Sequence, residues 1–97
     1  MFIGILKITF KLHAVFSLKE KRKISQSLKQ KIKNKYNVSI AETKHQNTSD
    51  FLEISLVTVS NDAKHVESIL NKIKDYIESI SSEEIIEINS DIFAYEI

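Results

Sequence analysis

The sequence contains no cysteine and no proline, and Gly4 is its only glycine. Without cysteine the chain has no disulfide bond, no thiolate metal site and no cysteine nucleophile. Phosphate-binding loops of the P-loop and dinucleotide-binding types need several glycines, because backbone N–H groups must approach the ligand closely. A single glycine therefore excludes both kinds of site.

Long apolar runs are also missing, and none approaches the roughly 20 residues that a membrane-spanning helix needs. The apolar residues 1–6 resemble the core of a signal peptide, but Lys7 and Lys11 interrupt the pattern and no small-residue cleavage site follows. We therefore expect a cytoplasmic protein that does not bind membranes. The 97 residues, 42% of them hydrophobic, suit a single domain over residues 1–97.

Positive charge is concentrated in the first third of the chain. Residues 1–36 contain ten lysine or arginine residues and one acid, Glu20, which gives this part a net charge of +9. Residues 37–97 contain four basic and twelve acidic residues, a net charge of −8, although the whole chain carries only +1. Such a concentration of cations attracts phosphate groups whatever the overall charge.

The order of secondary-structure elements follows from apolar periodicity. Alternation over residues 2–12 predicts a strand, and strands are also expected at 37–45 and 51–60, joined by a polar turn at 46–49. A capping box, Ser17-x-x-Glu20, predicts a helix that runs to about residues 34–36. A second helix should begin with Ser60 or Asn61 as its cap, helped by Asp62 near the positive end of the helix, and end at residues 81–82. The last strand should cover residues 85–97, and a break near 89–91 is left open.

This β-α-β-β-α-β order predicts an α+β fold. Right-handed crossover connections arrange such an order as a ferredoxin-like plait, with a four-stranded antiparallel sheet and both helices on one face.

Several short motifs occur in one order over nearly the whole chain: residues 17–22 (Ser-Leu-Lys-Glu-Lys-Arg), 37–42 with His45-Gln46, and 59–62 with 65–67. They resemble the YlxP-like family of small bacterial proteins, a domain of unknown function. The resemblance implies a ferredoxin-like fold and a cytoplasmic protein. It also implies RNA-linked or ribosome-linked work, because the family's genes often lie among those for transcription and translation factors. No established activity comes with the family.

The loop after the second strand departs from the pattern of that family. Relatives typically have an acid before His-Gln and the sequence Asp-Leu-Trp after it. Here Lys44 precedes His45-Gln46, and Asn47-Thr48-Ser49 follows. Whether the loop keeps any role that it has in the family is left open.

The start of the first predicted helix is the main candidate site. Lys19, Lys21, Arg22 and Lys23 lie where the helix dipole disfavours cations, at a cost of ~0.3–1 kcal/mol each. Free N–H groups together with several cations suit a phosphate group. Helical periodicity puts Lys21 on the apolar side of this helix, between Leu28 and Ile32, so the aliphatic part of its side chain should lie along the sheet edge. In the alternative interpretation these are solvated lysines, with Lys21 extending its ammonium group to water.

The basic face continues along the helix, and we add Lys29 to the candidate anion site. Further lysines at 31, 33 and 35 lie near the helix C-terminus, where cations are favourable and need no functional explanation. His45, at a strand end beside Gln46, is a second addition because an imidazole can hydrogen-bond a ribose or a phosphate. The alternative for His45 is a role in stabilising the turn.

The sheet face that the helices leave uncovered is a second candidate surface. Its apolar members, Ile3, Ile5, Val57 and Val59, favour a homodimer through this face, because exposed apolar patches usually mark interfaces. The alternative is a monomer with small scattered patches. Base stacking as in RNA-recognition modules is not expected, since the first strand offers no aromatic side chain there and the third only Phe51.

No catalytic, metal-binding or cofactor-binding residues are predicted. His13, His45 and His65 are too far apart in sequence to form a local metal motif. We expect a non-enzymatic RNA-binding or ribosome-associated protein whose basic first helix contacts phosphates. The alternative is a dimeric adaptor that binds an acidic protein surface. A small phosphatase-like enzyme ranks last, because residues 13–16 contain neither the glycine nor the arginine that its phosphate loop would need.

Overall fold

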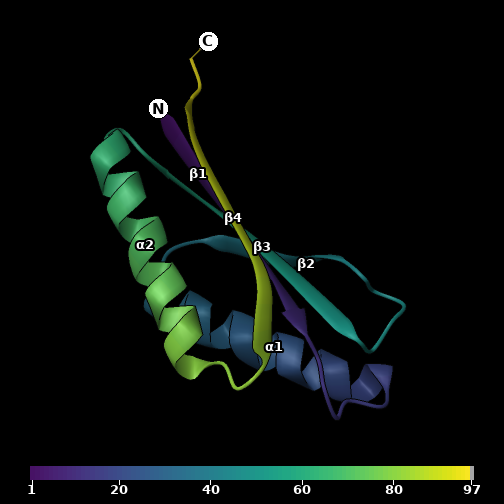
Figure 1. The fold of residues 1–97 in the computed structure, drawn as a ribbon. Coiled ribbons are helices and arrows are strands. Elements are labelled where there is room, and N and C mark those ends of the chain that lie inside the picture. Colours follow the sequence, from purple (N-terminus) through teal and green to yellow (C-terminus); the bar gives the residue numbers. More distant parts are fainter. Residues whose placement is uncertain (97) are drawn as a thin grey trace.

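The computed structural model describes residues 1–96. Its elements are, in chain order, β1 (Phe2–Lys11), α1 (Leu18–Lys35), β2 (Ser39–Lys44), β3 (Phe51–Ser60), α2 (Ala63–Ile80) and β4 (Glu84–Ala94) (Figure 1). The predicted β-α-β-β-α-β order is confirmed. Neither α1 nor α2 has the length and apolar character that crossing a membrane requires.

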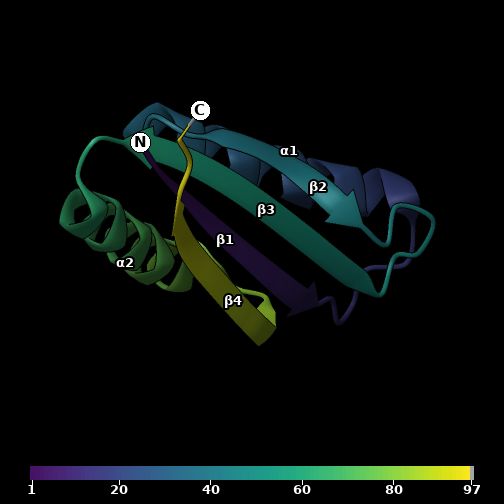
Figure 2. The same ribbon diagram turned by 90° about the horizontal axis from the view of Figure 1, so that it is seen from above.

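The four strands form one antiparallel sheet in the order β2-β3-β1-β4. Both helices lie on the same face of the sheet: α1 packs mainly beneath β2 and β3, and α2 beneath β1 and its neighbours (Figure 2). This arrangement confirms the α+β fold and the ferredoxin-like plait. The two ends of the described chain lie side by side, and the Tyr95 N–H donates to the carbonyl of Met1 at 2.8 Å.

The core lies between the sheet and the helices, as the alternation in β1 predicts. Even-numbered residues of β1 and β3 point toward the helices, while Ile3 and Ile5 point to the other face. The buried apolar residues of the core are Leu6, Ile8, Phe10, Leu12, Leu28, Ile32, Leu52, Ile54, Leu56, Val66, Leu70, Ile73 and Ile77.

The start of α1 follows the predicted capping box with one change. The Ser17 hydroxyl accepts a hydrogen bond from the Glu20 N–H at 3.1 Å, as expected. The Glu20 carboxylate, however, accepts from the N–H of Phe16 at 3.4 Å, one residue before the cap. Glu20 therefore fixes the chain that enters the helix as well as the first turn.

Two predicted element ends are wrong: the cap of α2, and the end of the last strand, which stops at Ala94. The cap of α2 is Asp62, whose carboxylate accepts from the Lys64 N–H at 3.0 Å, while the Ser60 hydroxyl accepts from the Asp62 N–H. The negative charge of this carboxylate is also attracted by the positive pole of the helix dipole, whereas a serine or asparagine cap carries no charge. Strand β4 has no break at 89–91. Its irregularity is a register shift opposite Thr9 and Phe10, where Ile86 remains unpaired. The final residue of the predicted last strand, Ile97, lies outside the described residues.

At Gly4 the backbone of β1 lies close to α2. A Cβ atom added to Gly4 would overlap the side chains of Val66 and Leu70, both of which are buried in the core. Adding atoms to a packed core forces side chains off their rotamers or shifts the backbone. The only glycine of the chain is therefore required by packing.

We predict that Gly4→Ala lowers the free energy of unfolding by about 1–3 kcal/mol, because the overlap outweighs the backbone entropy that alanine saves. Urea denaturation of the purified variant measures this change. Ala41→Val, on the exposed side of β2, is the control and should leave stability nearly unchanged. A Gly4→Ala variant as stable as the parent protein would contradict the proposed close approach.

Candidate functional site

The four cations at the start of α1 do not form a single cluster. Lys19, Arg22 and Lys23 are exposed, whereas Lys21 is only 2% exposed. The alternative in which Lys21 extends its ammonium group to water is therefore wrong. Three of the predicted anion-binding side chains face solvent and the fourth points into the protein.

Lys21 is held by the connection between β2 and β3. Its ammonium group donates to the backbone carbonyls of His45 and of Thr48, the latter at 2.8 Å, and lies 3.1 Å from Oε1 of Glu42. The Glu42 side chain is 18% exposed, so the ion pair is largely shielded from water. Through two hydrogen bonds to backbone carbonyls and one ion pair with Glu42, Lys21 anchors the 42–48 segment.

His45 lies in the same anchored segment. Its backbone has φ = 64°, a left-handed conformation that turns its carbonyl toward Lys21. Its ring packs against Phe51, with 5.3 Å between ring centroids, and the Lys11 ammonium group lies 4.4 Å from the centre of the same phenyl ring. These contacts fit the turn-stabilising alternative for His45, and its predicted contact with an anion stays a prediction.

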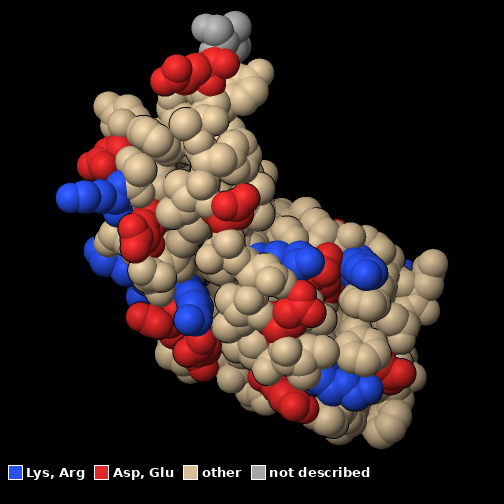
Figure 3. All heavy atoms as spheres, turned by 45° about the horizontal axis from the view of Figure 1, so that its top comes forward, with Lys and Arg blue, Asp and Glu red and all other residues tan. Residues whose placement is uncertain are grey.

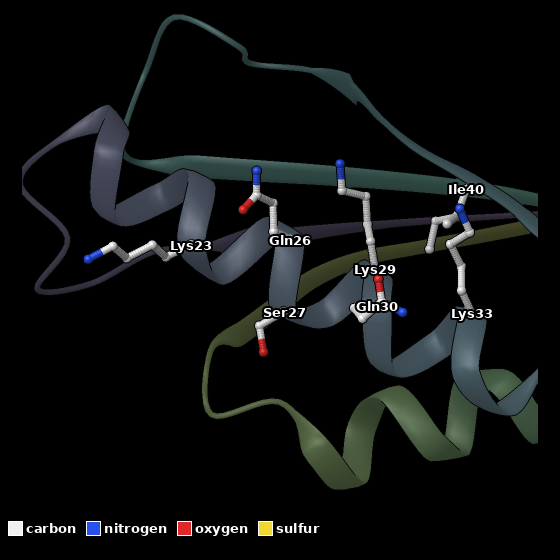
Figure 4. Close-up of a pocket in the computed structure, with 7 residues that line it drawn as sticks. All are labelled: Lys23, Gln26, Ser27, Lys29, Gln30, Lys33 and Ile40. Atoms are coloured by element: carbon white, nitrogen blue, oxygen red, sulfur yellow. The ribbon is translucent and has the colours of Figure 1, made fainter.

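An open groove of about 590 Å³ runs along the outer side of α1 beside β2 (Figure 4). The side chains of Gln26, Lys29 and Lys33 extend from α1 on the side of Ile40, whereas Ser27 points the opposite way. Three lysines, two glutamines and no carboxylate line the groove, so its polar groups are mainly hydrogen-bond donors. The lining residues are Lys23, Gln26, Ser27, Lys29, Gln30, Lys33 and Ile40.

The groove contains Lys23 and Lys29 from the predicted site and adds residues that the sequence analysis did not include. For Lys33 the sequence indicates only a positive charge that is favourable near the C-terminal end of the helix. Positions 23, 26, 30 and 33 follow spacings of three and four residues, which place side chains on one side of a helix. This three- and four-residue spacing is the feature of the sequence from which the groove could have been predicted.

The exposed cations of α1 are not neutralised by acids from the rest of the chain. Within residues 1–96 the ion pairs join Lys7 to Glu53, His13 to Glu84 and Lys21 to Glu42. Lys35 instead lies 4.2 Å from the ring centre of Tyr76, a cation–π contact that supports the structural interpretation of this lysine. On the face that Figure 3 shows, basic and acidic side chains are interspersed.

The predicted apolar patch is present on the sheet face opposite the helices. Ile3 pairs with Val59 and Ile5 with Val57, and Phe93 of β4 lies beside Ile3. Val59 is the most exposed of the four predicted residues, at 62%. Farther along the same face the surface is polar. Self-association through the patch stays a prediction.

The polar half of that face is organised around Glu53, which is buried at 7% exposure. Its carboxylate accepts from the Thr43 hydroxyl at 2.6 Å and lies 3.8 Å from the Lys7 ammonium group. Within residues 1–96 no group of three or more histidine or acidic side chains is arranged to hold a metal ion. We assign no catalytic chemistry to either half of the face.

Comparison with known proteins gives a family match. A family model described as "Protein of unknown function (DUF503)" matches residues 3–90. The "Uncharacterized protein YlxP" of Bacillus subtilis (strain 168) is 33% identical over 63 residues, which cover 65% of this chain and 68% of that protein. The crystal structure of SnoaB, a cofactor-independent oxygenase from Streptomyces nogalater, superposes with a TM-score of 0.47 at 7% identity, over 97% of this chain and 92% of that one. A likeness of this size carries no argument about function.

We predict that Lys21→Met lowers the free energy of unfolding by about 3 kcal/mol, because Glu42 and two loop carbonyls lose their shared donor. The double variant Lys21→Met/Glu42→Leu should recover part of the loss, since it removes the unpaired carboxylate. Urea denaturation gives the values. Lys19→Met, at an exposed position of the same turn, is the control and should change stability by less than about 0.5 kcal/mol. If both lysine variants were equally stable, the anchoring role of Lys21 would be refuted.

We predict that the parent protein self-associates and that Val59→Lys weakens the association, because it introduces a charge at the most exposed of the four predicted residues of the apolar patch. Sedimentation equilibrium over a range of protein concentrations measures the effect. Ile86→Lys makes the same chemical change at an exposed apolar residue outside the patch and should have no effect. A parent protein that stays monomeric throughout would show that the patch is not a dimer interface.

Proposed function

The chain belongs to the DUF503 family of proteins of unknown function, and we propose that it is a non-enzymatic RNA-binding protein that contacts phosphates through the basic face of α1. This basic face comprises the exposed cations Lys19, Arg22, Lys23 and Lys33 together with the half-buried Lys29. The observation that carries the proposal is the groove along α1, which presents three ammonium groups and no carboxylate.

The shape of the basic face favours a polymer of phosphates over a single phosphate. From Lys19 to Lys33 the helix rises about 21 Å, at about 1.5 Å per residue. A small anion is normally enclosed by several donors that converge on one point. Here the donors are spread along an open groove, which suits a chain with regularly repeated charges.

The contacts available to this face predict broad rather than sequence-specific binding. Lysine side chains that meet phosphate oxygens fix position and orientation but read no bases directly. Binding of this kind depends strongly on salt, because each neutralised phosphate releases condensed counterions. These are the properties of a factor that recognises RNA mainly by its backbone, as expected of a ribosome-associated protein. The cytoplasmic location expected from the sequence is part of the same proposal.

We predict that the triple variant Lys23→Ala/Lys29→Ala/Lys33→Ala binds RNA more weakly and with a smaller salt dependence. The slope of log affinity against log salt concentration should fall by about 2, because each lost contact to single-stranded nucleic acid accounts for about 0.7. Fluorescence anisotropy of a labelled oligoribonucleotide, measured at several salt concentrations, gives the slope. Lys21 is left intact because its loss would disturb the fold.

The matched control removes the same charge from α2, in the triple variant Lys64→Ala/Lys72→Ala/Lys74→Ala. Its slope should equal that of the parent protein. Equal slopes for the two triple variants would rule out the basic face as the RNA site. Capture of an acidic protein that persists after nuclease treatment, with no RNA affinity, would favour the adaptor alternative instead.

A further inference from the structure

Phe16 is far more exposed than any other large apolar residue of the described chain. Its exposed fraction is 86%, and the next highest value is the 62% of Val59. Phe16 immediately precedes Ser17, the cap of α1. A phenyl ring left in water at this point of the chain loses the stabilisation that burial would give it.

Phe16 is exposed because the side chain of Lys21 points into the protein and away from the phenyl ring. A residue in the position of Phe16 usually packs against the fourth residue of the helix, which here is Lys21. Lys21 points inward to the β2–β3 connection, so no apolar side chain is available there for the phenyl ring to contact. Val15, one residue earlier, packs against the core and directs Phe16 to the other side of the chain.

The main chain around Phe16 is nevertheless well fixed. Its N–H donates to the Glu20 carboxylate at 3.4 Å, and Ser17 caps the first turn. The ring therefore projects from an anchored backbone and would need little ordering on binding. A binding site gains affinity when its groups are already held in place before the ligand arrives.

Phe16 stands at the head of the row of side chains that forms the groove. Phe16 lies immediately before the cap of α1, and the first turns of the helix carry the exposed cations Lys19 and Lys23, of which Lys23 lines the groove. An aromatic ring next to a line of cations is the combination by which proteins bind single-stranded nucleic acids. The cations follow the backbone while a base stacks on the ring.

We infer that Phe16 stacks on an unpaired base of single-stranded RNA whose backbone follows the basic face of α1. The inference rests on the proposed function and narrows its ligand to single strands, because the bases of a duplex are already stacked on one another. The two central strands, β1 and β3, do not offer an equivalent platform, since the ring of their only aromatic residue on that face, Phe51, is in contact with His45 and Lys11.

The test compares a single-stranded oligoadenylate with a blunt RNA duplex of the same strand length. Phe16→Leu keeps an apolar side chain but removes the aromatic face. It should weaken binding of the single strand by about 5- to 100-fold and leave the salt slope and the duplex affinity unchanged. Because Phe16 is exposed, the variant should unfold at the same temperature as the parent protein.

Phe16→Trp supplies a second, direct measurement. The chain has no tryptophan, so the new indole is the only one and reports on its own surroundings. Its fluorescence should be quenched by the single strand and not by the duplex, and the affinity for the single strand should match or exceed that of the parent protein.

The outcomes separate the inference from the proposed function. If Phe16→Leu binds the single strand as tightly as the parent protein, stacking on Phe16 is refuted while phosphate binding by α1 stands. An equal loss for single strand and duplex would also refute stacking, because the ring would then act on the backbone contacts. If the parent protein binds neither RNA, both the inference and the proposed function are wrong.

Discussion

The buried ammonium group of Lys21 determines how α1 presents its other cations. A charge in the interior is costly unless acceptors surround it, and Glu42 together with two loop carbonyls provides them. At about 100° per residue, a helix that turns Lys21 inward turns Lys19, Lys23 and Gln30 to the opposite side. The inward lysine, together with the buried Leu28 and Ile32 on the same side, therefore fixes the rotation of α1 about its axis and, with it, the direction of the groove.

Periodicity and capping signals were sufficient to predict the order of the elements and the position of α1. The even residues of β1 are buried, and Ser17 caps α1 as its spacing to Glu20 indicates. The same reasoning places Lys21 on the apolar side of α1, but it does not identify the groups that surround its ammonium group. These lie 21, 24 and 27 residues farther along the chain, and one of them depends on the left-handed backbone of His45. No local pattern in the sequence records such a contact, so the sequence groups Lys21 with the exposed cations although its side chain is buried.

The basic first third of the sequence and the acidic remainder are only partly separated from each other in the folded protein. Acids of the later part of the chain pair with Lys7, His13 and Lys21, yet none pairs with the exposed cations of α1 within residues 1–96. Screening at physiological salt limits electrostatic effects to about 8 Å, so a phosphate near the groove would respond to these cations and hardly to the net charge of +1. Repulsion from the acidic parts would then orient an RNA strand toward α1.

The two surfaces that remain without a partner lie on opposite sides of the sheet. The basic face belongs to a helix packed beneath the sheet, whereas Ile3, Ile5, Val57 and Val59 lie on the face that the helices leave uncovered. A pair of chains joined through the apolar patch would therefore keep both copies of α1 on the outside. Each additional site on one strand then binds as an intramolecular event, so such a pair would favour long RNA over short fragments without any new contact. In such a pair the uncovered sheet face would serve assembly, and the helix layer would remain free for binding.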